Sequence, residues 1–81
     1  MRIDKYLKVS RLIKRRTVAH DACEQERIYV NGKEAKPSVQ VKPGDIVLIK
    51  FGTSEVKLKV LATPEHVLKD DAASLYQLIE D

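Results

Sequence analysis

The sequence predicts an α+β fold in which two short N-terminal helices pack on a small, antiparallel, hairpin-rich sheet. Apolar residues recur at helical spacing up to about residue 26 and alternate with polar ones from about residue 28. Asn31-Gly32, just after this change of period, is a strong two-residue hairpin signal. A chain of 81 residues has room for one thin core. We therefore expect a single domain over residues 1–81, with helices over about 2–26, the sheet over about 28–62 and an irregular tail with short elements over 63–81.

The first helix is expected to be short. Ile3, Tyr6 and Leu7 have helical spacing, and Asp4 lies near the start, where the helix dipole favours an anion. Residues 10–16 then fit a frayed helix end, a turn or the entry to the next helix, and the sequence leaves these alternatives open.

The second helix is expected to have Thr17 as its N-cap, because the threonine hydroxyl can accept a hydrogen bond from an amide one turn further on. Its end is expected near Glu26. No glycine stands before Arg27 to supply the usual left-handed stop. A left-handed conformation costs a non-glycine residue about 1 kcal/mol. We therefore expect this helix end to be remodelled.

The sheet is predicted from four segments. Residues 28–30 read as a strand that leads into the hairpin turn, and residues 42–45 read as a second turn with Pro and Gly in their customary places. Residues 46–51 form a nearly continuous apolar run, which is typical of a central strand covered by helices. Residues 56–60 alternate, as a half-buried strand does.

The C-terminal segment carries weaker signals. Residues 70–75 fit one helical turn, and residues 76–79 fit either a last short strand or a tail. Acidic groups are frequent here, and we expect them to be solvated, with contact to a basic protein as the alternative. The acids concerned are Glu65, Asp70, Asp71, Glu80 and Asp81.

The first sixteen residues hold most of the positive charge. Seven cations less one acid, Asp4, leave +6, whereas the whole chain has +3, so residues 17–81 sum to −3. Like charges this dense repel one another within about 8–10 Å. A polyanion gains from docking there, because each neutralised phosphate releases counterions. We expect these groups to be held outward and unpaired, except that Arg2 could pair with Asp4 or Asp21. They are Arg2, Lys5, Lys8, Arg11, Lys14, Arg15 and Arg16.

Other function classes find little support. His20 and Cys23 are three apart on one helix, but no third orienting group is visible, and adding His66 still leaves a zinc site one ligand short. We expect no enzymatic activity, no cofactor and no metal. One cysteine, no signal-peptide run and no long apolar stretch predict a cytoplasmic protein that does not engage a membrane. Four aromatic residues are too few for a base-stacking platform.

Several short motifs occur in the order found in one RNA-binding domain. Residues 2–7 resemble the R-[IL]-D-x-x-L opening of the S-four RNA-binding domain. Arg16, Ala19 and residues 28–32 resemble its S-R-x-x-A…I-x-V-N-G core, and residues 41–45 resemble its closing V-x-x-G-D. The match is closest to a stand-alone branch, the bacterial ribosome-associated quality control factor P family. The chain departs from the pattern at Arg15, where the family has Ser, and at Glu26, where it usually has Gly.

The resemblance implies an RNA surface formed by the two helices and the Asn31-Gly32 hairpin. It implies a non-enzymatic protein that binds large-subunit rRNA and P-site tRNA on a large ribosomal subunit with stalled peptidyl-tRNA. It also implies a larger partner factor that adds alanine tails to the stalled chain. RNA contacts carried over by position are Arg2, Lys5, Lys8, Arg11, Arg15, Arg16 and Thr17, with Asn31 and Lys33 as further candidates and Lys14 added on charge alone.

Three alternatives stay open on the sequence. The heat-shock protein fifteen branch of the same domain family also binds large subunits, but its members usually carry a longer basic C-terminal extension. A helix-turn-helix DNA-binding protein would need base-reading side chains at the exposed start of the second helix, and none stands there. The chain could also be an accessory fragment of an RNA-modifying enzyme.

Overall fold

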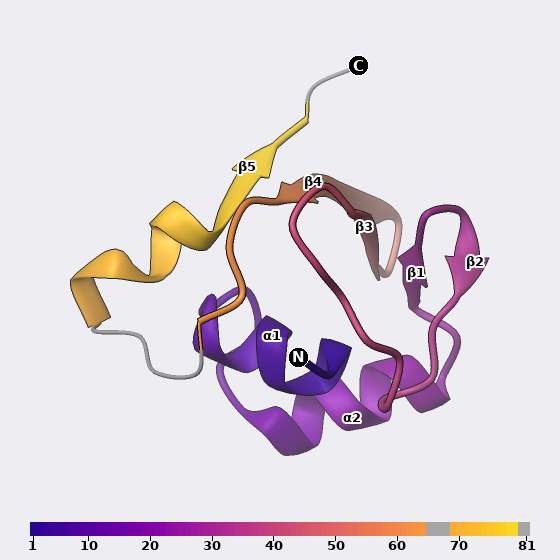
Figure 1. Ribbon diagram of the computed structural model, residues 1–81. Coiled ribbons are helices and arrows are strands. Elements are labelled where there is room, and N and C mark those ends of the chain that lie inside the picture. Colours follow the sequence, from indigo (N-terminus) through magenta and orange to yellow (C-terminus); the bar gives the residue numbers. More distant parts are fainter. Residues whose placement is uncertain (65–68, 80–81) are drawn as a thin grey trace.

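The computed structural model describes residues 1–64 and 69–79, which form two layers. Two helices lie on one side of a five-stranded antiparallel sheet with strand order β2-β1-β3-β4-β5 (Figure 1). The predicted α+β arrangement is therefore confirmed. No helix within the described residues is long and apolar enough to cross a membrane.

Helix α1 spans Ile3–Val9 and supplies much of the core. Ile3, Tyr6 and Leu7 are fully buried, as their spacing predicts. The start of the helix is tied to the loop before the third strand, because the N–H of Ile3 donates to the carbonyl of Val39 at 2.7 Å. The first turn of α1 is thus held both by the burial of its own side chains and by this hydrogen bond to the loop.

Helix α2 spans Arg16–Glu24 and packs on α1 through Ala19 and Cys23. The predicted N-cap is wrong. Arg15 occupies the cap position, without a side-chain cap bond, and Thr17 lies inside the first turn. The extended backbone of Arg15 turns the chain into the helix two residues earlier than a Thr17 cap would allow.

The end of α2 is also not remodelled as expected. Glu26 itself takes the left-handed conformation, with φ of 61°. The N–H of Arg27 donates to the Ala22 carbonyl at 3.0 Å, and that of Glu26 donates to the Cys23 carbonyl at 3.1 Å. These two bonds are those of a Schellman motif, which normally has glycine at the left-handed residue.

The sheet is built around two long inner strands. Strand β3 (Ile46–Phe51) pairs along its full length with β4 (Ser54–Val60), and on its other side it pairs with β1 (Ile28–Val30). Strand β2 (Lys33–Glu34) completes the hairpin with β1. The predicted central place of the apolar 46–51 strand is confirmed.

The hairpin turn has the geometry that its sequence predicts. Asn31 and Gly32 have φ of 53° and 85°, and two successive positive φ values are characteristic of a type I′ turn. The Asn31 side chain also ties the turn to β3. Its amide nitrogen donates to Asp45 Oδ1 at 3.2 Å, and its oxygen accepts the N–H of Ile46 at 2.9 Å.

The C-terminal segment joins both layers. A 3₁₀ helix, η1 (Lys69–Leu75), leads into strand β5 (Tyr76–Leu78), which pairs with β4 at the sheet edge. The hydroxyl of Tyr6 donates to the Leu75 carbonyl at 2.9 Å in the interior. The helical turn and short last strand expected from sequence are both present. Glu65, His66, Glu80 and Asp81 lie outside the described residues.

The left-handed Glu26 generates a prediction about stability. Replacing Glu26 with Gly removes the strain of an L-residue in this conformation but adds backbone freedom to the unfolded chain, so we expect a gain of up to about 1 kcal/mol in unfolding free energy. Gln25→Gly, one residue earlier at φ of −89°, is the control and should lose stability. Urea denaturation measures both. A Glu26→Gly variant less stable than the parent would contradict the strain.

Candidate nucleic-acid interface

A buried carboxylate organises the basic N-terminus. Asp4, in the first turn of α1, is only 2 % exposed. Its Oδ2 accepts from Nη2 of Arg2 at 3.1 Å, and its Oδ1 lies 3.5 Å from Nη2 of Arg16. The backbone N–H of Lys5 also donates to Oδ1, at 2.7 Å. One acid thus holds an arginine from each side of the α1–α2 contact.

The two arginines are anchored but not withdrawn from solvent. The side chains of Arg2 and Arg16 are 43 % and 48 % exposed. A guanidinium has five N–H donors, and each pair with Asp4 uses one nitrogen. The remaining donors are free to grip a phosphate through two hydrogen bonds. This corrects the expectation of wholly unpaired groups: Arg2 pairs as the sequence allowed, and Arg16 pairs as well.

Four further cations of the segment are exposed. Among the side chains that the structure describes, those of residues 1–64 and 71–79, none of these four forms an ion pair. Lys5 is half-buried at the helix surface. The four exposed cations are Lys8 on α1, and Arg11, Lys14 and Arg15 in the link to α2.

The link between the helices turns sharply at Arg11. Its φ is 60°, a left-handed conformation directly after the C-cap Ser10. The Arg11 N–H donates back to the Lys8 carbonyl at 3.0 Å, and the N–H of Ile13 donates to the Leu7 carbonyl. Ile13 is buried. The turn therefore anchors the link in the core while its cations stay on the surface.

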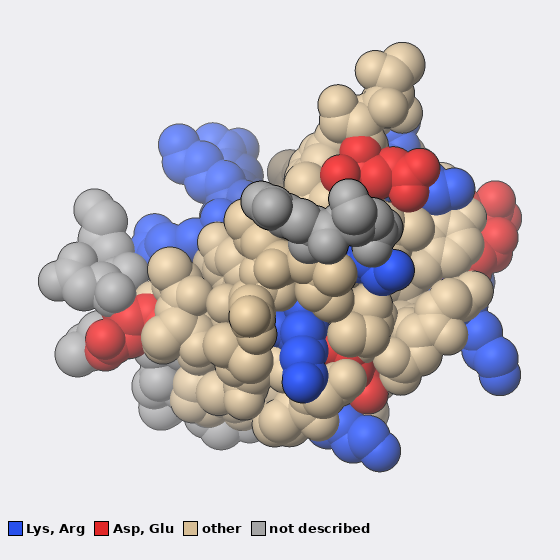
Figure 2. All heavy atoms as spheres, turned by 90° about the horizontal axis from the view of Figure 1, so that it is seen from above, with Lys and Arg blue, Asp and Glu red and all other residues tan. Residues whose placement is uncertain are grey.

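The opposite side of the molecule differs in character. Figure 2 looks onto the side that carries β4, β5 and the C-terminal end. Most basic groups there stand apart from one another on a largely uncharged surface, with acidic groups near several of them, whereas basic groups adjoin at the upper left of the view. Charges of both signs are thus mixed over most of this face. The N-terminal segment, with seven cations and one acid in sixteen residues, is the stronger candidate for a polyanion because of its charge density.

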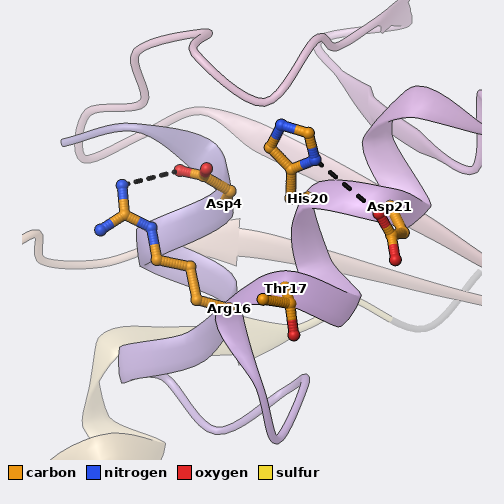
Figure 3. Close-up of a pocket in the computed structure, with 5 residues that line it drawn as sticks. All are labelled: Asp4, Arg16, Thr17, His20 and Asp21. Atoms are coloured by element: carbon orange, nitrogen blue, oxygen red, sulfur yellow. Dashed lines mark hydrogen bonds and ion pairs between the residues drawn. The ribbon is translucent and has the colours of Figure 1, made fainter.

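The start of α2 borders a shallow hollow of about 300 Å³ lined by Asp4, Arg16, Thr17, His20 and Asp21. In Figure 3 the Arg16 guanidinium turns towards Asp4, while His20 and Asp21 form a separate pair at 3.8 Å. Thr17 is exposed at this hollow, so its hydroxyl is accessible to a ligand and is not used as a helix cap.

The hairpin candidates fall into two kinds. Asn31 uses both ends of its amide inside the fold, towards Asp45 and Ile46. Asp45 also accepts the N–H of Lys42 at 3.0 Å. Lys33 is exposed on the edge strand β2. Asn31 therefore positions the hairpin, and Lys33 is the hairpin side chain with a free surface.

Cys23 is not arranged for nucleophilic chemistry. It is 1 % exposed, and burial, with smaller contributions from the charges of Asp4 and Glu24, raises the pKa of its thiol to about 11. The neutral thiol therefore dominates at neutral pH. Among the described residues, no group of three His, Cys, Asp or Glu side chains could hold a metal ion.

Sequence reasoning missed the central role of Asp4. The signal was present, because Asp4 is the one acid among sixteen residues that hold seven cations. The helical pattern of apolar residues does not predict the burial of a charged residue such as Asp4, which lies next to Ile3 in the same turn.

The comparisons with known proteins agree with this geometry. A family model, the S4 domain, matches residues 1–47. The RQC P-site tRNA stabilizing factor of Listeria monocytogenes is 51 % identical over 81 residues, which cover all of this chain and 88 % of that protein. The Bacillus subtilis protein of the same name is 46 % identical, covering all of this chain and 94 % of its own. The chain belongs to the S4-domain family of RQC P-site tRNA stabilizing factors. The family predicted from sequence is confirmed.

Solved structures show that the fold of this S4-domain chain is shared. Heat Shock Protein 15 of Vibrio cholerae superposes with a TM-score of 0.88 at 28 % identity, covering 98 % of this chain and 81 % of that one. The solution structure of the hypothetical protein HP1423 gives a TM-score of 0.85 at 31 % identity, with all of this chain and 99 % of that one covered. The two-layer fold is therefore common to both branches weighed from the sequence.

Asp4 generates a prediction about stability. Asp4→Asn keeps the size of the side chain but removes the charge that faces two guanidinium groups, so we expect unfolding free energy to fall by about 1–3 kcal/mol. Asp21→Asn, which removes an exposed acid from the same hollow, should change stability little. Urea denaturation compares the two. Equal effects of both substitutions would contradict the organising role of Asp4.

Cys23 generates a pH prediction. Its pKa is raised from an ordinary 9.0 to about 11 in the folded chain, so folding keeps the proton that the unfolded chain loses. Stability is then complete below about pH 9 and falls as the pH rises towards 11. Cys23→Ala should have a lower unfolding free energy overall. Between pH 9 and pH 11, however, that free energy should fall by on the order of 1 kcal/mol less than in the parent. Parallel pH profiles of the two proteins would contradict the assignment.

Proposed function

We propose that this chain is a non-enzymatic RNA-binding protein that binds rRNA and tRNA on the large ribosomal subunit. There it supports ribosome-associated quality control of stalled nascent chains, together with a larger factor that adds alanine tails. The proposal places the protein in the cytoplasm. The observation that carries it is the arginine pair held by Asp4, together with four exposed cations of the same N-terminal segment that form no ion pair among the described residues.

The chemistry of the surface favours structured RNA. An A-form helix hides its base edges in a narrow major groove, so proteins read mostly its shape and phosphates. Arginines pre-oriented by a buried acid fit that task, since the guanidinium meets a phosphate through two donors without first losing much side-chain freedom. Tyr6 and Tyr29, which could have stacked on bases, are respectively buried and covered by Lys50.

The names of the relatives support a particular ligand. Proteins about half identical over the whole chain are called RQC P-site tRNA stabilizing factors, and a structural neighbour is a heat-shock protein. From the first of those names we infer P-site tRNA as a partner, and the large subunit is the partner that the motif resemblance implies. The proposed RNA contacts are Arg2, Lys5, Lys8, Arg11, Lys14, Arg15, Arg16 and Thr17, with Lys33 at the hairpin and Asn31 as its positioning residue.

Arg16→Ala tests the surface directly. The variant loses one phosphate contact, so we expect weaker association with large subunits and a log–log salt slope smaller by somewhat under one unit. Lys59→Ala removes an exposed cation from β4 and is the control, which should leave both unchanged. Arg16→Lys keeps the charge but not the two-donor grip and should fall between. Salt-dependent filter binding and sedimentation measure these effects.

Two results would contradict the proposal. An unchanged sedimentation profile for Arg16→Ala would remove Arg16 from the site. A preference for duplex DNA over structured rRNA and tRNA in direct competition would favour the helix-turn-helix alternative. Sequencing the RNA that copurifies with the tagged chain should recover both ribosomal and transfer RNA.

A further inference from the structure

A second hollow lies where the helix link, the outer face of α2 and the end of β3 meet. It has a volume of about 310 Å³. Its lining includes Val18 from α2 and Phe51 from the end of β3, which are 51 % and 45 % exposed. Leu12, from the link, is half-buried and packs against the core beside them. Exposed apolar side chains gathered in one concave place mark an interaction surface more often than single ones do.

The rim of this groove is basic. Lys14, Arg27 and Lys50 line it, and no acidic residue does. Arg27 follows directly on the Schellman turn at Glu26, so its backbone is fixed by the bond to the Ala22 carbonyl. The Lys50 ammonium, however, lies 4.7 Å from the centroid of the Tyr29 ring, and Tyr29 does not line the groove. Side chains alternate along a strand, so Lys50 directs its charge to the sheet face opposite to its lining neighbours Ile49 and Phe51. The charges at the rim of this apolar floor are thus those of Lys14, from the helix link, and Arg27, directly before β1.

The floor and rim together indicate the kind of occupant. Interfaces with nucleic acid are strongly polar, and single strands are held by several stacked rings. This floor is mostly aliphatic, and Phe51 is the one ring among its lining residues. A protein segment that carries apolar side chains between carboxylates would bury Val18 and Phe51 and place its acids against Lys14 and Arg27.

We propose that this groove docks an acidic segment of a partner protein through one or two apolar side chains. The groove shares only Lys14 with the RNA surface. Its other lining residues are therefore available to a protein segment without being taken from the proposed RNA contacts. The proposal goes beyond the proposed function, and the experiment below uses the free chain, so that it does not depend on ribosome binding.

The probe is a short synthetic peptide of Asp and Glu around a central Leu-Phe pair. Titrated into the full, isotope-labelled chain, it should shift the amide signals of Val18, Arg27 and Phe51 in a saturable way. Two control peptides separate the forces. In the first control peptide, Lys replaces every acid, so that its charges repel the basic rim. In the second, Ser replaces Leu and Phe, so that no apolar side chain can enter the groove. Both controls should bind at least about tenfold more weakly.

Matched variants locate the site. Phe51→Ser and Val18→Ser remove the anchor contacts and should each weaken the acidic peptide about tenfold. Arg27→Glu should weaken the acidic peptide and strengthen the lysine peptide, a reversal that a merely structural role would not produce. Lys59→Ala, away from the groove, should change neither. Retained amide spectra establish that each variant is folded.

A second arm uses the assembled particle. A photoreactive benzoylphenylalanine in place of Phe51, irradiated in purified large subunits carrying stalled peptidyl-tRNA, should join the chain to an acidic protein segment identified by mass spectrometry. Three results would overturn the proposal: crosslinks to RNA alone, equal binding of the three peptides, or an unchanged charge preference in Arg27→Glu. Failure of Arg16→Ala to weaken RNA binding would leave the peptide titrations of the free chain intact, so the two proposals fail separately.

Discussion

The buried carboxylate of Asp4 is the constraint on which the RNA surface depends. It lies at the contact of the two helices and faces one arginine from each side. Buried charge is costly without partners, so the fold is most stable when Arg2 and Arg16 remain close to this acid. The same requirement fixes where their guanidinium groups emerge. Stability and ligand geometry are therefore set by one group, and the start of α2 cannot shift without disturbing both.

Much of the fold could be predicted because its signals are local. Helical spacing of Ile3, Tyr6 and Leu7, the Asn31-Gly32 turn and the apolar 46–51 run each determine structure over a few residues. The errors arose where a competing local choice decided the outcome. Thr17 is a good cap in isolation, but the extended Arg15 already starts the helix.

The candidate site was less predictable, because its organisation is non-local. The pattern located the cations, but the ion pair between Asp4 and Arg16 joins residues twelve positions apart. The apolar groove joins three elements and has no sequence motif. Conversely, Asn31 and Asp45, two residues of the family motifs, bond to each other and hold the hairpin against β3. Part of what the RNA-binding motif encodes is therefore the frame of the sheet.

The order of the strands affects how the unbound protein avoids aggregation. The two outermost strands, β2 and β5, have only two and three residues, whereas the inner strands β3 and β4 have six and seven. The unpaired backbone groups of an edge strand can hydrogen-bond to another chain and so promote aggregation. Very short edge strands reduce this tendency. The apolar strand β3 is thus paired on both sides, with β4 along its full length and with β1 over Val47–Ile49, which suits a small chain in a crowded solution.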